Sequence, residues 1–148
     1  MVNERRVCCD TSFLFSIYGN DIHTEKALAF RDHQAAVVFL SPLNGYELLN
    51  ALRLAGFRRL LSAEEVRTRI TRFEKDVAGG QWGDLPCNLA DVLRESARLS
   101  KERTLEGGHR SFDILHVAAA RVMGAQDFLT FDANQRRLAE SEGLKVPL

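Results

Sequence analysis

The sequence predicts an α/β protein, a three-layer α/β/α sandwich in which helices cover both faces of a mainly parallel central sheet. Short apolar segments of strand length alternate along the chain with segments of helix length that begin at recognisable capping residues. Strands separated by helices pair in parallel, because each connection has to cross over the sheet. No repeat, low-complexity segment or linker interrupts the alternation. We therefore expect one domain over residues 1–148.

The first half of the chain contains two expected strands, at residues 7–9 and in the β-branched segment 35–40. Between them, TSFLFSIYG is expected to form a helix with Thr11 or Ser12 as its N-cap. Thr24 is expected to cap a second helix that continues to about residue 30.

Two further helices in this half have clear start signals. Ser41 and Pro42 place a cap and a first-turn proline at the start of a helix that reaches about residue 55. Because Leu, Ala and Tyr side chains surround most of this helix, we expect it to be buried. Ser62 and Glu65 form a capping box for the next helix, which ends before a pair of glycines.

In the second half, Asn88 is expected to cap a helix to about residue 104, and Ser111 a helix over FDILHVAAARVM. The apolar segment FLTF, residues 128–131, is the third expected strand, and ANQRRLAESE is the last helix. LKVPL at the end of the chain predicts a weak final strand, and GGQWGDLP a connection.

The composition is typical of a soluble globular protein, with 45% hydrophobic and 27% charged residues. No apolar run reaches the roughly 18 residues that a membrane span requires. The N-terminus lacks the apolar core of a signal peptide, and the three cysteines fit neither a disulfide framework nor a zinc site. These features predict a cytoplasmic protein with reduced, buried thiols and no membrane association.

The formal net charge is zero, so a global basic field is excluded as the basis of any nucleic-acid binding. One local basic segment, RLAGFRRLLSAEEVRTRITR, runs from Arg53 to Arg72. It is either a local contact surface for nucleic acid or the solvated face of mixed-charge helices.

Four acidic residues lie at positions that acids usually avoid. Asp10 and Asp132 directly follow expected strands, at the sheet edge where open parallel sheets bind ligands. Glu47 and Asp113 are each the only acid of a helix that is apolar on most sides. Structural explanations exist for three of them: Asp10 and Asp132 as caps, the latter with Gln135, and Asp113 through the helix dipole.

A single cause explains all four acids together. Carboxylates brought within about 4 Å of each other repel by roughly 4 kcal/mol at an effective dielectric near 20, and a divalent cation reverses the sign of that interaction. Ligand sets made only of oxygen suit Mg²⁺ or Mn²⁺. Such a cluster supports hydrolysis of a phosphodiester by a metal-activated water, with no protein nucleophile.

Four segments resemble the PIN-domain nucleases, and within them the VapC-type toxins of toxin–antitoxin pairs. They are CCDTSFL, SPLNGYELLNAL, RSFDILHVAAA and FLTFDANQRRLAESEGLKV, in the family's order and spread over essentially the whole chain. The resemblance implies a PIN-like fold and a metal-dependent endoribonuclease that hydrolyses RNA phosphodiester bonds. It makes Asp10, Glu47, Asp113 and Asp132 the catalytic and metal-binding residues, with Mg²⁺ or Mn²⁺ as cofactor.

The resemblance also implies supporting residues and partners. Thr11 and Thr130 would supply hydroxyls that orient carboxylates or metal-bound waters. The expected partners are an RNA substrate, a cognate antitoxin protein and a second copy of the chain in a homodimer. From their positions alone, Arg110 is a candidate for binding an RNA phosphate, and Asn134 for contacting RNA or the metal-bound water.

The sequence leaves two other functions open. The chain could be a PIN-like module that binds RNA or protein without cleaving it. It could also be a doubly wound phosphatase of the haloacid dehalogenase type, but such enzymes need a second Asp two residues after the first. Ser12 occupies that position after Asp10, which disfavours a phosphatase.

Overall fold

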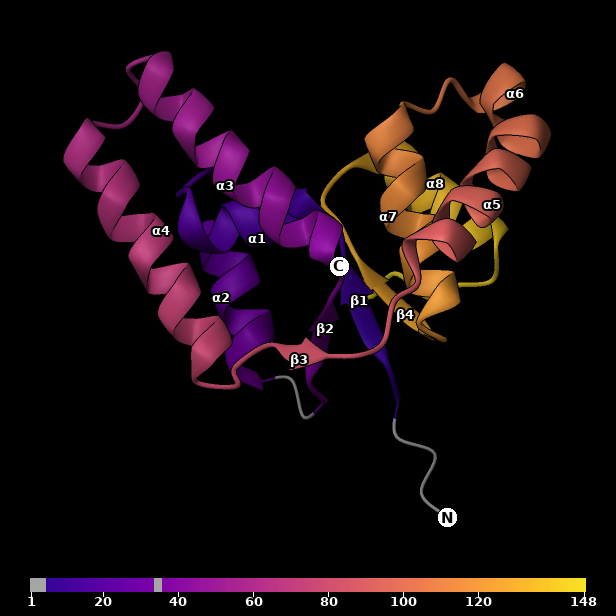
Figure 1. Ribbon diagram of the computed structural model, residues 1–148, viewed down its shortest axis with the longest axis horizontal. Coiled ribbons are helices and arrows are strands. Elements are labelled where there is room, and N and C mark those ends of the chain that lie inside the picture. The colour runs from indigo at the N-terminus through magenta and orange to yellow at the C-terminus, as the bar shows by residue number, and fades with distance from the viewer. Residues whose placement is uncertain (1–4, 34–35) are drawn as a thin grey trace.

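The structure is a computed structural model that describes residues 5–33 and 36–148. It confirms the α/β/α architecture, with a parallel sheet in the order β3-β2-β1-β4 (Figure 1). The strands are β1 (Val7–Cys9), β2 (Val38–Leu40), β3 (Gly83–Asp84) and β4 (Asp127–Leu129). None of the helices in the described residues is long and apolar enough to cross a membrane.

The helices fall into two groups on either side of the sheet (Figure 1). The first group contains α1 (Thr11–Tyr18), α2 (Thr24–His33), α3 (Pro42–Phe57) and α4 (Ala63–Ala78). The second contains α5 (Leu89–Leu99), a π-helical turn η1 (Ser100–Thr104), α6 (Leu105–Gly107), α7 (Ser111–Val122) and α8 (Ala133–Ser141).

Alternate residues of β1 point into two separate hydrophobic cores. Val7 and Cys9 belong to the core under the first helix group, where Phe13 of α1 is also buried. Cys8 points the other way, into the core under the second group with Phe128. This period-two alternation is what places β1 between two layers of helices.

The carboxyl end of β1 lies at the centre of the sheet edge, because β1 pairs with both β2 and β4. Its register with β4 ends at Cys9 and Leu129, after which the Asp10 N–H donates to the Leu129 carbonyl at 3.1 Å. The chain then turns into α1. The strand predicted at residues 128–131 therefore ends at Leu129, since Thr130 has no further β1 residue to pair with.

The predictions of strands at residues 35–40 and in LKVPL were also wrong in extent. β2 begins at Val38, and residue 35 of the predicted range 35–40 lies outside the described residues. The predicted final strand LKVPL contributes only an isolated bridge between Lys145 and Asp127. Pro147, two residues later, has no N–H to continue a ladder.

The predicted connection GGQWGDLP contains a short strand that the sequence analysis missed. Gly83 and Asp84 have low strand propensity, but they pair with Phe39 and Leu40 at the edge of the sheet. A Cβ on Gly83 would lie 2.4 Å from the Phe39 ring, so only glycine fits this close approach.

Several helix boundaries differ from the predictions. Asp10, rather than Thr11 or Ser12, is the N-cap of α1, and Ser111 is the first residue of α7 rather than its cap. The predicted helix from Asn88 to residue 104 is α-helical only to Leu99 and then widens into the η1 turn. The capping predictions for Ser41, Ser62 and Asn88 are confirmed, because these residues are the N-caps of α3, α4 and α5.

The prediction that α3 is buried was wrong for one of its faces. Asn44, Leu48 and Leu52 pack into the molecule, but Tyr46 and Phe57 are 67% and 83% exposed. The apolar composition of this helix therefore reflects two different surfaces, one in the core and one in solvent.

Candidate active site

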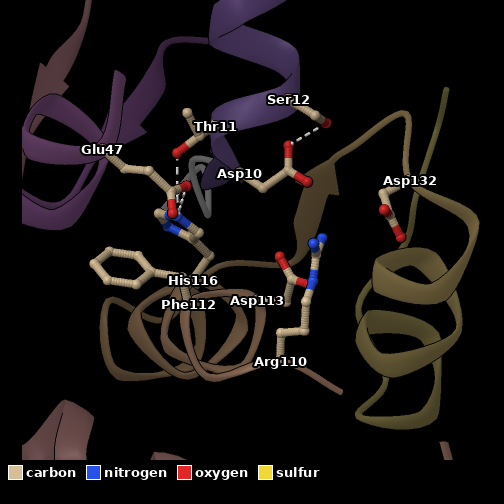
Figure 2. A pocket seen from close by; sticks show the side chains of 9 residues that line it. All are labelled: Asp10, Thr11, Ser12, Glu47, Arg110, Phe112, Asp113, His116 and Asp132. Carbon is tan, nitrogen blue, oxygen red and sulfur yellow. Dashed lines mark hydrogen bonds and ion pairs between the residues drawn. The ribbon is translucent and has the colours of Figure 1, made fainter. Parts of the chain in front are cut away.

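A cavity of about 440 Å³ opens beside the carboxyl ends of β1 and β4 (Figure 2). All four predicted acids line it, and each comes from a different element of the fold. Asp10 follows β1, Glu47 lies in α3, Asp113 in the first turn of α7, and Asp132 caps α8. The other lining residues are Thr11, Ser12, Arg110, Phe112 and His116.

Asp10 is buried at the floor of the cavity and bonded on both carboxylate oxygens. Its Oδ1 accepts hydrogen bonds from the Ser12 hydroxyl at 2.7 Å and the Phe13 N–H at 3.1 Å. Its Oδ2 accepts from the Thr130 hydroxyl at 2.5 Å. Burial raises the pKa of Asp10, and the hydrogen bonds from Thr130 and Ser12 oppose that rise. The carboxylate is therefore fixed in orientation by its neighbours.

Thr130 connects Asp10 to Asp132. The same hydroxyl oxygen that donates to Asp10 accepts the Asp132 backbone N–H at 3.0 Å. Asp132 in turn caps α8 by accepting the Gln135 N–H at 2.8 Å. The Gln135 side chain does not return to the cap as a capping box requires, because it donates to the Asp113 carbonyl at 3.0 Å.

Glu47 points toward His116 on the side of the cavity opposite Asp132 (Figure 2). The His116 Nε2 atom lies 2.9 Å from Glu47 Oε1 and 3.1 Å from the Thr11 hydroxyl. Burial opposes the charge on Glu47, but hydrogen bonds from His116 and Thr11 outweigh it and lower the pKa of this carboxyl.

The tautomer of His116 follows from its second ring nitrogen. The Asn44 carbonyl oxygen accepts the Ser41 N–H, so its amide nitrogen faces the Cys9 carbonyl at 3.0 Å and His116 Nδ1 at 3.5 Å. Nδ1 therefore faces a donor, and a proton on Nε2 would face Glu47.

Asp113 forms an ion pair with Arg110, the residue at the N-cap of the same helix. Arg110 Nε lies 3.1 Å from Asp113 Oδ2, across a single turn of α7. The hydrogen bond and the charge of Asp113 raise the pKa of Arg110, which stays a cation. Arg110 itself is largely exposed at the cavity, with 80% of its side chain accessible.

The donor set fits a hard divalent ion, since four carboxylates and no thiolate face the cavity. Among residues 5–33 and 36–148, however, no three His, Cys, Asp or Glu side chains are grouped as a ready-made metal site. Glu47 is held by His116 through Oε1 and Asp113 by Arg110 through Oδ2, so each of these ion pairs uses a single carboxylate oxygen.

The structure adds residues that the sequence analysis did not assign to the site. Ser12 bonds Asp10, His116 bonds Glu47, and Phe112 forms part of the wall. Ser12 left a signal in the sequence as a hydroxyl two residues after a capping Asp, and His116 as a histidine three residues after Asp113 on an apolar helix. Asn134 lies outside the lining and bonds His109 and Arg137.

The family model that matches this chain is that of the PIN domain, over residues 7–141. The protein therefore belongs to the PIN domain family. A comparison with curated protein sequences gave no match.

Solved structures share the fold at low sequence identity. FitAcB from Neisseria gonorrhoeae has a TM-score of 0.67 and 18% identity, covering 95% of both chains. VapBC2 from Rickettsia felis, bound to a DNA fragment from its promoter, has a TM-score of 0.63 and 12% identity over 95% of this chain and 96% of its own. VapBC-1 from nontypeable Haemophilus influenzae has a TM-score of 0.61 and 11% identity, with the same coverage.

Proposed function

We propose that this protein is a cytoplasmic endoribonuclease dependent on Mg²⁺ or Mn²⁺, and the toxin of a toxin–antitoxin pair. One observation carries the proposal: four acids from four separate elements of a PIN domain line a single cavity. PIN domains are generally nucleases, and carboxylates gathered at one cavity are the ligand type that hydrolytic divalent ions require.

In this proposal Asp10, Glu47, Asp113 and Asp132 would hold the ion. When bound, a divalent ion supplies an activated water and neutralises charge at the phosphate. The chain's own contribution is positioning. Thr130 and Ser12 fix the Asp10 carboxylate, while Thr11 and His116 hold Glu47.

Arg110 is the proposed phosphate ligand. Its guanidinium is exposed beside the cavity and already engages a carboxylate, a geometry that also suits a phosphate oxygen. Breaking the ion pair between Arg110 and Asp113 would free the guanidinium to bind RNA and, at the same time, the carboxylate to bind the ion. Asn134, held between His109 and Arg137 next to α8's start, is proposed to contact the same strand.

The family and the fold support the proposed partners. The two VapBC structures carry the name of the toxins that the sequence resembles, which supports an antitoxin as partner. A homodimer is proposed on the same basis. Expression of the chain alone should arrest growth, and co-expression of a small protein from the adjacent reading frame should relieve the arrest.

Cleavage of a panel of structured RNAs tests the activity. Asp10→Asn and Asp113→Asn should abolish cleavage while leaving the melting temperature close to that of the wild type. Chelation of divalent ions should stop the wild-type reaction, and Mg²⁺ or Mn²⁺ should restore it. Glu74→Gln, an exposed acid on α4, is the matched control and should cleave normally.

Two results would count against the enzyme. Equal cleavage by the wild type and both site variants would assign the activity to a contaminant. Calorimetric binding of Mn²⁺ with no cleavage of any RNA would instead favour a PIN-like binding module.

A further inference from the structure

We propose that the exposed face of α3 is a binding track for single-stranded RNA that leaves the cavity. The track consists of Tyr46, Asn50, Arg53 and Phe57, which we call the α3 track. It rests on the proposed function, since it supplies the strand-binding surface for the same site. It also explains why α3 carries aromatic side chains on a face that is in solvent.

The four residues lie on one side of the helix. Their spacing of four, three and four residues returns to the same face of an α-helix at each step. All four are exposed, Tyr46 at 67% and Phe57 at 83%. The track extends for about 16 Å along the axis, at about 1.5 Å per residue. That length is enough to follow several nucleotides.

The track begins at the cavity wall. The ring of Phe112, which lines the cavity, stacks against Tyr46 with centroids 6.2 Å apart and planes at 25°. Phe112 also contacts His116, with centroids 6.0 Å apart. Aromatic surface therefore continues from the side chain that holds Glu47 to the first residue of the track. From this end, α3 itself runs outward, away from the sheet (Figure 1).

The charge of this surface suits a polyanion. Within the described part of the chain, Arg53, Arg58 and Arg59 are exposed and make no ion pair, whereas Arg69 of α4 is paired with Glu65. Aromatic rings interleaved with free arginines are the arrangement by which proteins bind single strands, stacking bases and contacting phosphates.

Binding of fluorescein-labelled RNA, followed by anisotropy, tests the track. The protein carries Asp113→Asn so that the probe is not cut. Phe57→Ala should weaken binding of a single-stranded oligonucleotide of about 12 nucleotides by about five- to a hundred-fold. Arg53→Gln should reduce the slope of log K against log salt by about 0.7, the share of one phosphate contact.

Matched variants and a short probe separate the track from general effects. Leu105→Ala removes an apolar side chain that is 97% exposed on α6, and Lys101→Gln removes one exposed charge from η1. Neither should change affinity. A dinucleotide, which fills the cavity without reaching along α3, should bind all variants equally.

Three results overturn the track. The first is that Phe57→Ala and Arg53→Gln leave the affinity for the long probe and its salt dependence unchanged. The second is that both variants weaken binding of the dinucleotide as much as binding of the long probe, which would indicate damage to the site. The third is that Phe57→Ala dissociates a dimer in sedimentation experiments without changing the affinity for RNA, which would make α3 a protein interface.

The proposal of the track and the proposal of the enzyme can be refuted independently. Cleavage by the wild type together with unaltered binding by the track variants removes the track and leaves the enzyme. Track-dependent binding with no cleavage under any metal condition leaves an RNA-binding surface and removes the enzyme.

Discussion

Glu47 and His116 form a hydrogen-bonded pair, with 2.9 Å between Oε1 and Nε2, although 69 residues separate them in the chain. The pair joins α3 to α7 across the cavity. One partner is a proposed metal ligand and the other is a buried side chain 2% exposed, so the catalytic and structural contributions of the pair can be measured separately.

Substitution on the Glu47 side should affect cleavage alone. Glu47→Gln keeps an acceptor for the His116 N–H, so the free energy of unfolding should stay within about 0.5 kcal/mol of the wild type. Cleavage should be lost.

Substitution on the His116 side should affect stability. His116→Leu leaves Thr11 and Asn44 without their ring partner and should lower the free energy of unfolding by about 1–3 kcal/mol. Urea unfolding of both variants checks this prediction, and an unstable Glu47→Gln would contradict it.

An acid-sensitive ion-pair network should stabilise the second helix group. Glu95 lies 2.5 Å from Arg98 and 2.7 Å from Arg121, and these contacts lower the pKa of Glu95 to about 2 despite partial burial. Because the folded state holds the proton less tightly than the unfolded chain, this contribution is full above the ordinary pKa of 4.5 and is lost as the pH falls toward 2.

Glu95→Gln tests that network. At neutral pH it should lower the free energy of unfolding by about 0.5–1 kcal/mol, a small effect because the arginines are partly exposed. The difference from the wild type should close as the pH approaches 2. Glu74→Gln should show no such pH-dependent difference, and a gap that persists in acid would refute the assignment.

The three cysteines should differ in reactivity. Burial raises the pKa of Cys8 to about 12 and the pKa of Cys9 well above its usual value, while Cys87 is only half-buried. Thiolates are the reactive form, so a brief iodoacetamide treatment of the native protein should modify Cys87 first. Peptide mass mapping gives the result, with the urea-unfolded chain as a control in which all three react. Early modification of Cys8 or Cys9 would show that β1 is accessible.

Tyr18 should attach α4 to α1 through its hydroxyl group. Its hydroxyl donates to Asp76 Oδ2 at 2.5 Å and accepts from Trp82 Nε1 at 2.8 Å. Tyr18→Phe leaves the buried Trp82 N–H unpaired and should cost about 1–3 kcal/mol in thermal or urea unfolding. Tyr46→Phe removes a hydroxyl in solvent and should be neutral; equal effects of the two would disprove the attachment.

The sequence predicted those parts of the fold that depend on local patterns. The caps at Ser41, Ser62 and Asn88 were identifiable because a side-chain oxygen at the start of a helix satisfies free backbone N–H groups. The meeting of Asp10 and Asp132 was also predictable, because both follow parallel strands and such strands end at one sheet edge.

Features that depend on distant partners were not predictable in this way. β3 exists because Phe39 and Leu40 offer a free edge, and nothing in Gly83 or Asp84 itself favours a strand. The side-chain direction of Glu47 depends on a histidine in another helix. The solvated side of α3 was missed because its aromatic residues have the composition of a core.

The pairing of β4 with β1 has a consequence for synthesis of the protein. Thr130 contacts Asp10 from 120 positions further along the chain, and Asp113 and Asp132 also come from its last quarter. A growing chain on the ribosome therefore exposes Asp10 and Glu47 long before the segments that complete the cavity have been made. Whatever this cavity does, it can begin only after the ribosome has added Asp132.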